Sequence, residues 1–258
     1  MKIFDSHAHL TDEHYDNDRE AVIERTLREL AGMIHPGTTM EDSRAAAALA
    51  KQYERIWAAV GVHPEEARSM QPGDEQRLAD LAADDKVVAI GEIGLDYFYE
   101  DAAPRELQQS VLIRQLDLAK QLALPVIIHD RDAHGDILDI LRREGKGVYG
   151  VFHCFSGSWE MAKELLKRDF YLSFGGPLTF SNAAKLRDIA QKAPLDRMLL
   201  ETDSPYLTPH PLRGHRNEPV NVKLVAEKMA TLRGLSVEAI AEATTANVQT
   251  LFGIKVSD

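Results

Sequence analysis

The chain has a single cysteine, no long apolar run and no glycine-rich phosphate loop after its first apolar segment. Cys154 has no second cysteine to pair with, so an intramolecular disulfide is excluded, as is typical of proteins from a reducing compartment. No stretch approaches the roughly 20 apolar residues that a membrane-spanning helix requires. The N-terminus begins with a strand pattern and not with a signal peptide. We therefore expect a cytoplasmic protein without a membrane anchor.

An excess of basic residues is also missing, since 41 acidic against 30 basic residues give a formal net charge of −11. A protein that coats duplex DNA usually carries a basic surface to displace counterions, so the charge argues against extensive non-specific duplex binding. Divalent cations, or basic side chains confined to a cleft, could still receive an anion locally. The charge thus favours a small or terminal phosphate as substrate without excluding nucleic acid. We expect no obligate protein partner and a monomer, because no exposed apolar seam is evident.

What the chain does contain is a regular alternation of short β-branched runs and longer segments of helical period. The strand candidates are Lys2–Leu10, Gly32–Gly37, Ile56–His63, Val87–Leu95, Pro125–Asp130, Val148–Phe155, Tyr171–Gly175 and Met198–Asp203. The helix candidates are Asp18–Leu30, Glu41–Tyr53, Pro104–Leu122, Asp132–Arg143, Trp159–Lys167, Asn182–Gln191, Glu218–Arg233 and Ser236–Phe252. Eight such units without a flexible linker predict one α/β domain over residues 1–258, a closed (β/α)8 barrel. An open doubly wound sheet is the alternative, and it usually carries a glycine-rich loop after its first strand.

Residues of the metal-ligand type stand where the apolar runs end. His7 and His9 lie two apart at the end of the first run, and alternation along a strand would point both side chains the same way. A (β/α)8 barrel collects its functional residues at the C-terminal ends of the strands. Later runs could therefore complete a metal centre that no local stretch builds alone, through His63, Glu92, His129, His153 and Asp203.

Each of these residues has a chemical reason to be there. A carboxylate inside an apolar strand, such as Glu92, is costly unless it pairs with a charge or a metal, and its two oxygens can bridge two ions. Neutral imidazoles such as His129 and His153 are good ligands for zinc and its neighbours. Asp203 could ligate a metal and also accept a proton from the attacking water. Asp96, further into the loop, could orient a ligand or be one.

Polar residues beside these strand ends suggest a substrate site, and for each an alternative stays open. His63 could contact substrate or metal. Arg131 could hold a phosphate or remain a solvated arginine. Arg213 and Arg216 could clamp phosphate oxygens, or their loop could dock the C-terminal helices. Glu201 could fix the ring of a metal-bound histidine or form a buried salt bridge.

Motifs in order along almost the whole chain, up to the segment Asn247–Phe252, resemble the TatD family of metal-dependent deoxyribonucleases. They are Asp5-Ser6-His7-Ala8-His9-Leu10, Gly61-Val62-His63-Pro64, Gly91-Glu92-Ile93-Gly94-Leu95-Asp96-Tyr97, His153-Cys154-Phe155-Ser156-Gly157, Glu201-Thr202-Asp203-Ser204-Pro205-Tyr206-Leu207 and Arg213-Gly214-His215-Arg216-Asn217-Glu218-Pro219. The resemblance implies a (β/α)8 barrel of the amidohydrolase superfamily with a metal site at the C-terminal ends of the strands. The family's ligands carry over onto His7, His9, Glu92, His129, His153 and Asp203.

The resemblance further implies a divalent-metal-dependent hydrolase, most simply a 3′-to-5′ exonuclease on DNA ends or single strands. We expect two ions of Zn, Mn, Mg, Co or Ni, one held by His7, His9, Glu92 and Asp203 and the other by Glu92, His129 and His153. Glu92 and Asp203 are the expected catalytic residues. The alternative is a deacylase or amidohydrolase acting on an ester or amide such as aminoacyl-tRNA, because the same activated water attacks carbon or phosphorus. A non-catalytic binding module would lack a ligand, and the set here is intact.

Overall fold

The computed structural model describes residues 2–256, and its centre is a barrel of parallel strands that neighbour one another in chain order. The strands are β1 (Phe4–Asp5), β2 (Gly32–Pro36), β3 (Ile56–Val60), β4 (Val87–Asp96), β5 (Val126–Arg131), β6 (Gly150–Phe152), β7 (Phe170–Phe174) and β8 (Met198–Leu200). Backbone hydrogen bonds close the ring between β8 and β1, where Ser6 donates to the Leu200 carbonyl (3.0 Å) and Asp203 to the His7 carbonyl (2.9 Å). The predicted barrel is confirmed, because a doubly wound sheet would reverse the strand order at a switch point.

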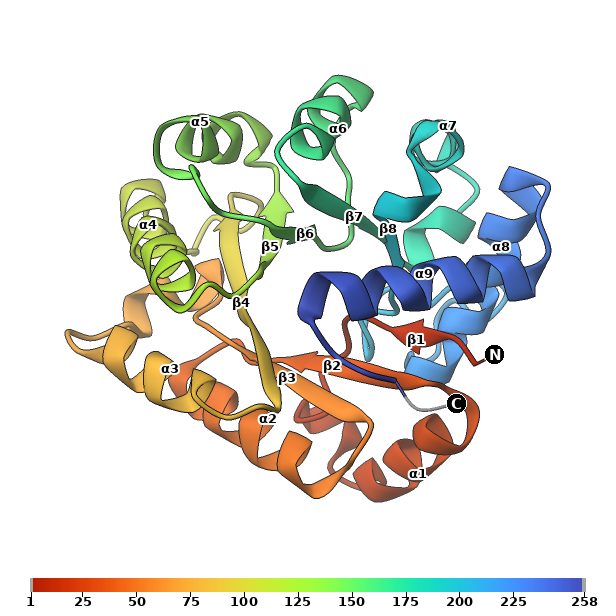
Figure 1. Ribbon diagram of the computed structural model, residues 1–258, viewed down its shortest axis with the longest axis horizontal. Coiled ribbons are helices and arrows are strands. Elements are labelled where there is room, and N and C mark those ends of the chain that lie inside the picture. Colours follow the sequence, from red (N-terminus) through yellow and green to blue (C-terminus); the bar gives the residue numbers. More distant parts are fainter. Residues whose placement is uncertain (1, 257–258) are drawn as a thin grey trace.

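Helices surround the barrel and follow the strands along the chain (Figure 1). They are α1 (Arg19–Glu29), α2 (Met40–Gln52), α3 (Asp74–Ala82), α4 (Arg105–Leu122), α5 (His134–Glu144), α6 (Trp159–Leu166), α7 (Ala184–Lys192), α8 (Val222–Arg233) and α9 (Val237–Phe252). The sequence analysis missed α3, whose nine residues bury only Asp74 and Leu78 and so show little apolar period. In the described part of the chain, no helix is long and apolar enough to cross a bilayer.

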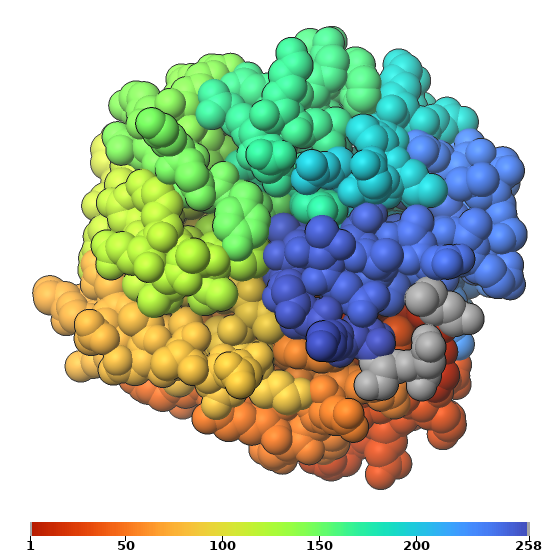
Figure 2. Space-filling model, viewed as in Figure 1, coloured from red at the N-terminus to blue at the C-terminus, as the bar shows by residue number. Residues whose placement is uncertain are grey.

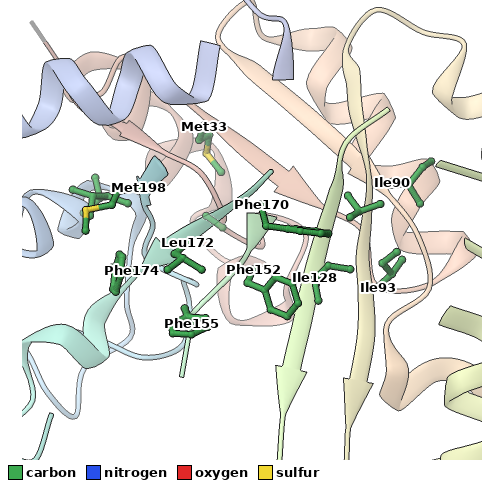
Figure 3. Packing of buried hydrophobic residues seen from close by; sticks show 14 of the residues in the cluster. Met33, Ile90, Ile93, Ile128, Phe152, Phe155, Phe170, Leu172, Phe174 and Met198 are labelled. Atoms are coloured by element: carbon green, nitrogen blue, oxygen red, sulfur yellow. The ribbon is translucent and has the colours of Figure 1, made fainter. Parts of the chain in front are cut away.

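The apolar core has two layers. Strand residues such as Met33, Phe152 and Phe170 pack in the layer between barrel and helices (Figure 3). A second cluster joins residues from the strands, Trp57 among them, to Val248, Leu251 and Phe252 of α9. Figure 2 shows α9, in dark blue, at the centre of the viewed face, where it covers one mouth of the barrel.

Four strands end well before their predicted ends. β1 ends at Asp5 instead of Leu10, β3 at Val60 instead of His63, β6 at Phe152 instead of Phe155, and β8 at Leu200 instead of Asp203. The chain turns away soon after β6 and β8, because Cys154 (φ 42°) and Asp203 (φ 55°) adopt the left-handed conformation. Beyond β1 the backbone instead forms a single parallel bridge between Ala8 and Ser204. His7, His9, His153 and Asp203 therefore stand just beyond the strand ends, whereas His129 lies within β5.

Candidate metal centre

The six predicted ligands meet in one cluster at the C-terminal ends of the strands, away from α9. Five of the eight strands contribute to it: His7 and His9 follow β1, Glu92 lies in β4, His129 in β5, His153 follows β6 and Asp203 follows β8. A register shift between β4 and β5 separates the pairs formed by Ile90 and Ile93. This irregularity lets the Glu92 side chain reach the cluster from the middle of a strand whose residues are all buried.

The two carboxylate oxygens of Glu92 face different imidazoles. Oε1 lies 2.8 Å from Nε2 of His153 and 2.9 Å from Nδ1 of His129. Oε2 lies 3.2 Å from Nε2 of His7 and 3.5 Å from Nε2 of His9. We call Glu92, His129 and His153 the Oε1 group, and Glu92, His7 and His9, together with Asp203, the Oε2 group. Glu92 is thus the one residue shared by both groups.

Asp203 completes the Oε2 group, since its Oδ1 lies 3.6 Å from Nε2 of His7 and 3.5 Å from Nε2 of His9. Nε2 of His7 and Nε2 of His9 are 3.1 Å apart, as are Nδ1 of His129 and Nε2 of His153. A tetrahedral cation with bonds of about 2.0–2.1 Å holds neighbouring ligand atoms roughly 3.3 Å apart. The donor atoms therefore fit divalent cations of the zinc type, both in chemistry and in spacing.

Electrostatics explain why these buried groups need compensating charge. Burial alone would raise the pKa of the Glu92 carboxyl, but the surrounding imidazoles, above all His153 and His7, outweigh burial and hold its pKa well below the usual range. Burial likewise opposes a charged His129, yet hydrogen bonds to Asp96 and Glu92 raise its pKa to about 9. The Glu92 carboxylate is thus ionised, and the adjacent His129 ring is protonated at neutral pH. A divalent cation would supply the same positive charge.

Two further carboxylates hold the rings of the Oε1 group from behind. Nε2 of His129 donates to Oδ2 of the fully buried Asp96 (2.9 Å), so Asp96 contacts the ring nitrogen that faces away from Glu92. Oε1 of the buried Glu201 lies 3.6 Å from Nδ1 of His153 and accepts a hydrogen bond from the Cys154 backbone. This geometry favours an orienting role for Asp96, while Glu201 lies behind the His153 ring without a hydrogen bond to it.

A cavity of about 890 Å³ opens over the cluster. His63 and Arg131 line it, as expected of residues that contact substrate. The Nδ1 of His63 accepts a hydrogen bond from the Glu65 backbone (3.3 Å), which leaves the ring proton on Nε2, 3.6 Å from Oε1 of Glu92. Burial and the neighbouring His129 lower the pKa of His63 to about 3, so the ring is neutral.

The two predicted clamp residues do not reach this cavity. Arg216 forms ion pairs with Asp18 (2.7 Å) and Glu218 (3.1 Å), and its guanidinium lies over the Tyr15 ring. Arg213 lies over the ring of Phe180 instead. Arg216 therefore ties the loop to the start of α1, and not to the C-terminal helices that the docking alternative named.

The sequence analysis missed several residues of the cavity wall. The carboxylates of Asp12, Asp42, Glu65 and Glu66 line it, and so do the rings of Tyr99 and Tyr206. None of these residues lies in a strand, since Asp42 is in the first turn of α2 and Glu65 and Glu66 are in a 3-10 helix, so position relative to the strands gave no signal for them. Tyr206 lies within a motif noted above, although nothing in the motif indicates that its ring is exposed.

With this geometry in place, comparison with known proteins identifies the family. The sequence profile of the TatD-related DNases matches residues 4–253. The chain belongs to the TatD family.

Several known proteins match it over almost their whole length. An uncharacterized metal-dependent hydrolase, YabD of Bacillus subtilis (strain 168), is 48% identical over 254 residues, which cover 98% of this chain and 99% of that protein. The 3′-5′ ssDNA/RNA exonuclease TatD of Shigella flexneri serotype 5b (strain 8401) is 35% identical, covering 98% of this chain and 99% of that protein. The crystal structure of YJJV, a TatD homologue from Escherichia coli K12, superposes with a TM-score of 0.90 at 34% identity and covers 98% of each chain. The predicted family is confirmed, and the chain is a metal-dependent hydrolase.

Proposed function

We propose that this TatD-family hydrolase removes nucleotides from the 3′ end of single-stranded DNA, using two divalent ions held by the two groups of ligands. The observation that carries the proposal is the division of Glu92, whose oxygens face separate sets of imidazoles. A carboxylate shared in this way suits a pair of ions that stabilise the attacking and leaving oxygens of a phosphodiester. The name of the Shigella relative, a 3′-5′ ssDNA/RNA exonuclease, supports the same substrate.

When bound, the ions would lower the pKa of a water molecule and neutralise charge on the phosphoryl oxygens. The protein's own contribution begins with Asp203. Burial would raise the pKa of its carboxyl, but the hydrogen bond with His9 and the charges of His153 and His7 lower it. Asp203 is therefore ionised at neutral pH, and it lines the cavity, where it can accept the proton of the attacking water.

His63 and Arg131 would position the substrate. Because its proton is on Nε2, neutral His63 can donate a hydrogen bond to a phosphoryl oxygen, which favours substrate contact over metal ligation. Arg131 keeps its guanidinium beside the rings of Phe98 and Tyr99 at the cavity wall, and there it can pair with a phosphate. Both residues orient the phosphodiester for in-line attack.

The proposal is tested on a 5′-labelled oligonucleotide incubated with Mg, Mn or Zn, with products separated by length. We expect a ladder of products shortened from the 3′ end, and we expect the shortening to stop when a chelator is added. An aminoacyl-tRNA run in parallel tests the alternative of a deacylase. Faster release of the amino acid, with an intact oligonucleotide, would refute the nuclease.

A matched pair of variants links the activity to Glu92. Glu92→Gln keeps the shape of the side chain but removes the charge shared by both groups, so kcat/KM should fall more than about 100-fold. Glu66→Gln makes the same change at a cavity residue that contacts none of the imidazoles among the described residues, and it should stay close to the wild type. Equal activity of the two variants would contradict the proposal.

A further inference from the structure

Exposed aromatic rings concentrate beside the mouth of the metal-site cavity. Among residues 2–256, the phenylalanine, tyrosine and tryptophan side chains that are more than a third exposed are Phe98 (52%), Tyr99 (44%) and Tyr206 (48%). Tyr99 and Tyr206 line the cavity, and Phe98 contacts Tyr99 edge to face with ring centroids 5.0 Å apart. Exposed apolar side chains that gather at one cavity mark ligand sites, and these rings suit a ligand with its own flat apolar surface.

The rings stand on opposite sides of the metal centre. Tyr99 follows β4, and Tyr206 follows β8, which is four strands away around a barrel of eight. Tyr206 lies on the side of the Oε2 group, with its ring centroid 6.4 Å from that of His9. Tyr99 lies on the side of the Oε1 group, next to Arg131, which extends from the same strand as His129. A phosphodiester at the metal centre would therefore have one ring on each side.

Both rings are held in place before any ligand binds. The guanidinium of Arg131 lies 3.7 Å from the centroid of Phe98 and 5.2 Å from that of Tyr99. The hydroxyl of Tyr206 donates to Oδ2 of Asp12 (2.5 Å). Fixed rings lose little conformational entropy on binding, which is a property of preformed recognition sites.

The side chains of the cavity wall carry too few positive charges to bind a nucleic acid by charge alone. The cavity wall carries the carboxylates of Asp12, Asp42, Glu65, Glu66 and Asp130, in addition to those of the metal centre. Among the lining residues that the structure describes, Arg131 is the only arginine or lysine. Stacking between a base and an aromatic ring does not depend on net charge, and it tolerates any base.

From these observations we propose that Tyr99 and Tyr206 form two base-stacking subsites, one for each nucleobase flanking the scissile phosphate. The inference rests on the proposed function and specifies its substrate: two unpaired terminal nucleotides. In a duplex the faces of the bases are already stacked on their neighbours, so the subsites select single strands. The enzyme would thus recognise a dinucleotide at the strand end, and not a longer stretch of nucleic acid.

The test compares ring removal with ring retention. Tyr99→Leu and Tyr206→Leu each remove a stacking surface, and KM for a single-stranded oligonucleotide should rise roughly 5- to 100-fold for each. Tyr99→Phe keeps the ring and should remain near the wild type, and Tyr206→Phe keeps the ring but loses its hydrogen bond to Asp12, so its KM should rise less than that of Tyr206→Leu. Tyr53→Leu, at the end of α2 and remote from the cavity, is the control for loss of a tyrosine elsewhere.

A second substrate identifies the partner of the rings. An oligonucleotide whose last two nucleotides lack bases should have a high KM with the wild type. The leucine substitutions should not raise that KM further. The preference for single strands over a blunt duplex should shrink in the leucine variants. Leucine variants that cleave the normal strand with the wild-type KM and keep that preference would overturn the subsites.

Failure of the proposed function gives a different result. A wild-type enzyme that cleaves no strand with any metal contradicts the exonuclease, and the subsites are then tested by binding alone. The fluorescence of a trinucleotide containing 2-aminopurine should be quenched by the wild type and by the phenylalanine variants. Quenching that is equal in the leucine variants, or missing in the wild type, would overturn the inference.

Discussion

Replacing Asp96 with asparagine would remove a charge from behind the Oε1 group while keeping the shape of the side chain. Oδ2 of Asp96 accepts from Nε2 of His129, and Oδ1 accepts from the Phe98 backbone, both at 2.9 Å. An amide has one acceptor oxygen, so in either orientation its NH2 group faces the N–H of His129 or the backbone N–H of Phe98. The residue is fully buried, and water cannot repair the lost bond.

The expected consequence is a selective loss of metal affinity. Changes in groups that support a ligand from behind weaken metal binding about 10- to 100-fold, and the unavoidable donor clash places Asp96→Asn near the upper value, about 2.7 kcal/mol. His129 belongs to the Oε1 group alone, so the ion bound by the Oε2 group should keep its affinity. Activity at limiting metal should fall and return when metal is added in excess.

The assay is a metal titration against a chromophoric chelator, which resolves two binding steps. Asp136→Asn is the matched control, because this carboxylate accepts hydrogen bonds from Tyr97 and Gln109 and contacts no imidazole among the described residues. Equal weakening of both steps in Asp96→Asn, or unchanged affinity, would refute the orienting role of Asp96.

Two further predictions concern stability. In Gly94→Ala, the new Cβ would lie 1.9 Å from the His129 carbonyl oxygen, at a residue with a φ of 152°, so β4 and β5 must separate. Urea denaturation should then show a free energy of unfolding lower by about 3 kcal/mol or more. The control Gly135→Ala, whose new Cβ meets no atom within 4 Å, should change this free energy little. Equal stability of the two would show that the β4–β5 contact is loose. Removal of metal should lower the melting temperature reversibly, since a ligand at 100 times its Kd stabilises the folded state by about 2.7 kcal/mol per site. A melting curve that a chelator leaves unchanged would argue against occupied sites.

The barrel and the cluster of ligands could be predicted from sequence because both depend on strand ends. Runs such as the one closed by His153 mark where a strand stops, and a parallel barrel brings all such ends together. Glu92 shows the limit of this reasoning. Ala89 packs with the apolar cluster that includes Trp57. If side chains simply alternated along β4 from Ala89, Gly91 and not Glu92 would face the same side as Ala89. The register shift between Ile90 and Ile93 reverses that outcome, and no residue pattern reveals it.

Residues whose role depends on distant partners could not be assigned in this way. Arg216 looked free to bind phosphate until its pairing with Asp18, 198 residues away, became visible. The same applies to the exposure of Tyr206, because an aromatic residue in a loop is as compatible with packing as with a ligand site. Side-chain chemistry is local, whereas burial and pairing belong to the fold.

The pairing of Arg216 also bears on how an acidic protein can act on a phosphate. Arg213 and Arg216 are engaged with Phe180 and Asp18, so Arg131 remains as the arginine at the cavity. One arginine neutralises about one phosphate, which corresponds to a salt slope of only about −0.7 for a single strand. Under the proposed function, bound ions would offset the charge of the scissile phosphate, and base stacking would supply the remaining affinity. Such a site would hold a strand end well and the middle of a long strand poorly, as an exonuclease requires.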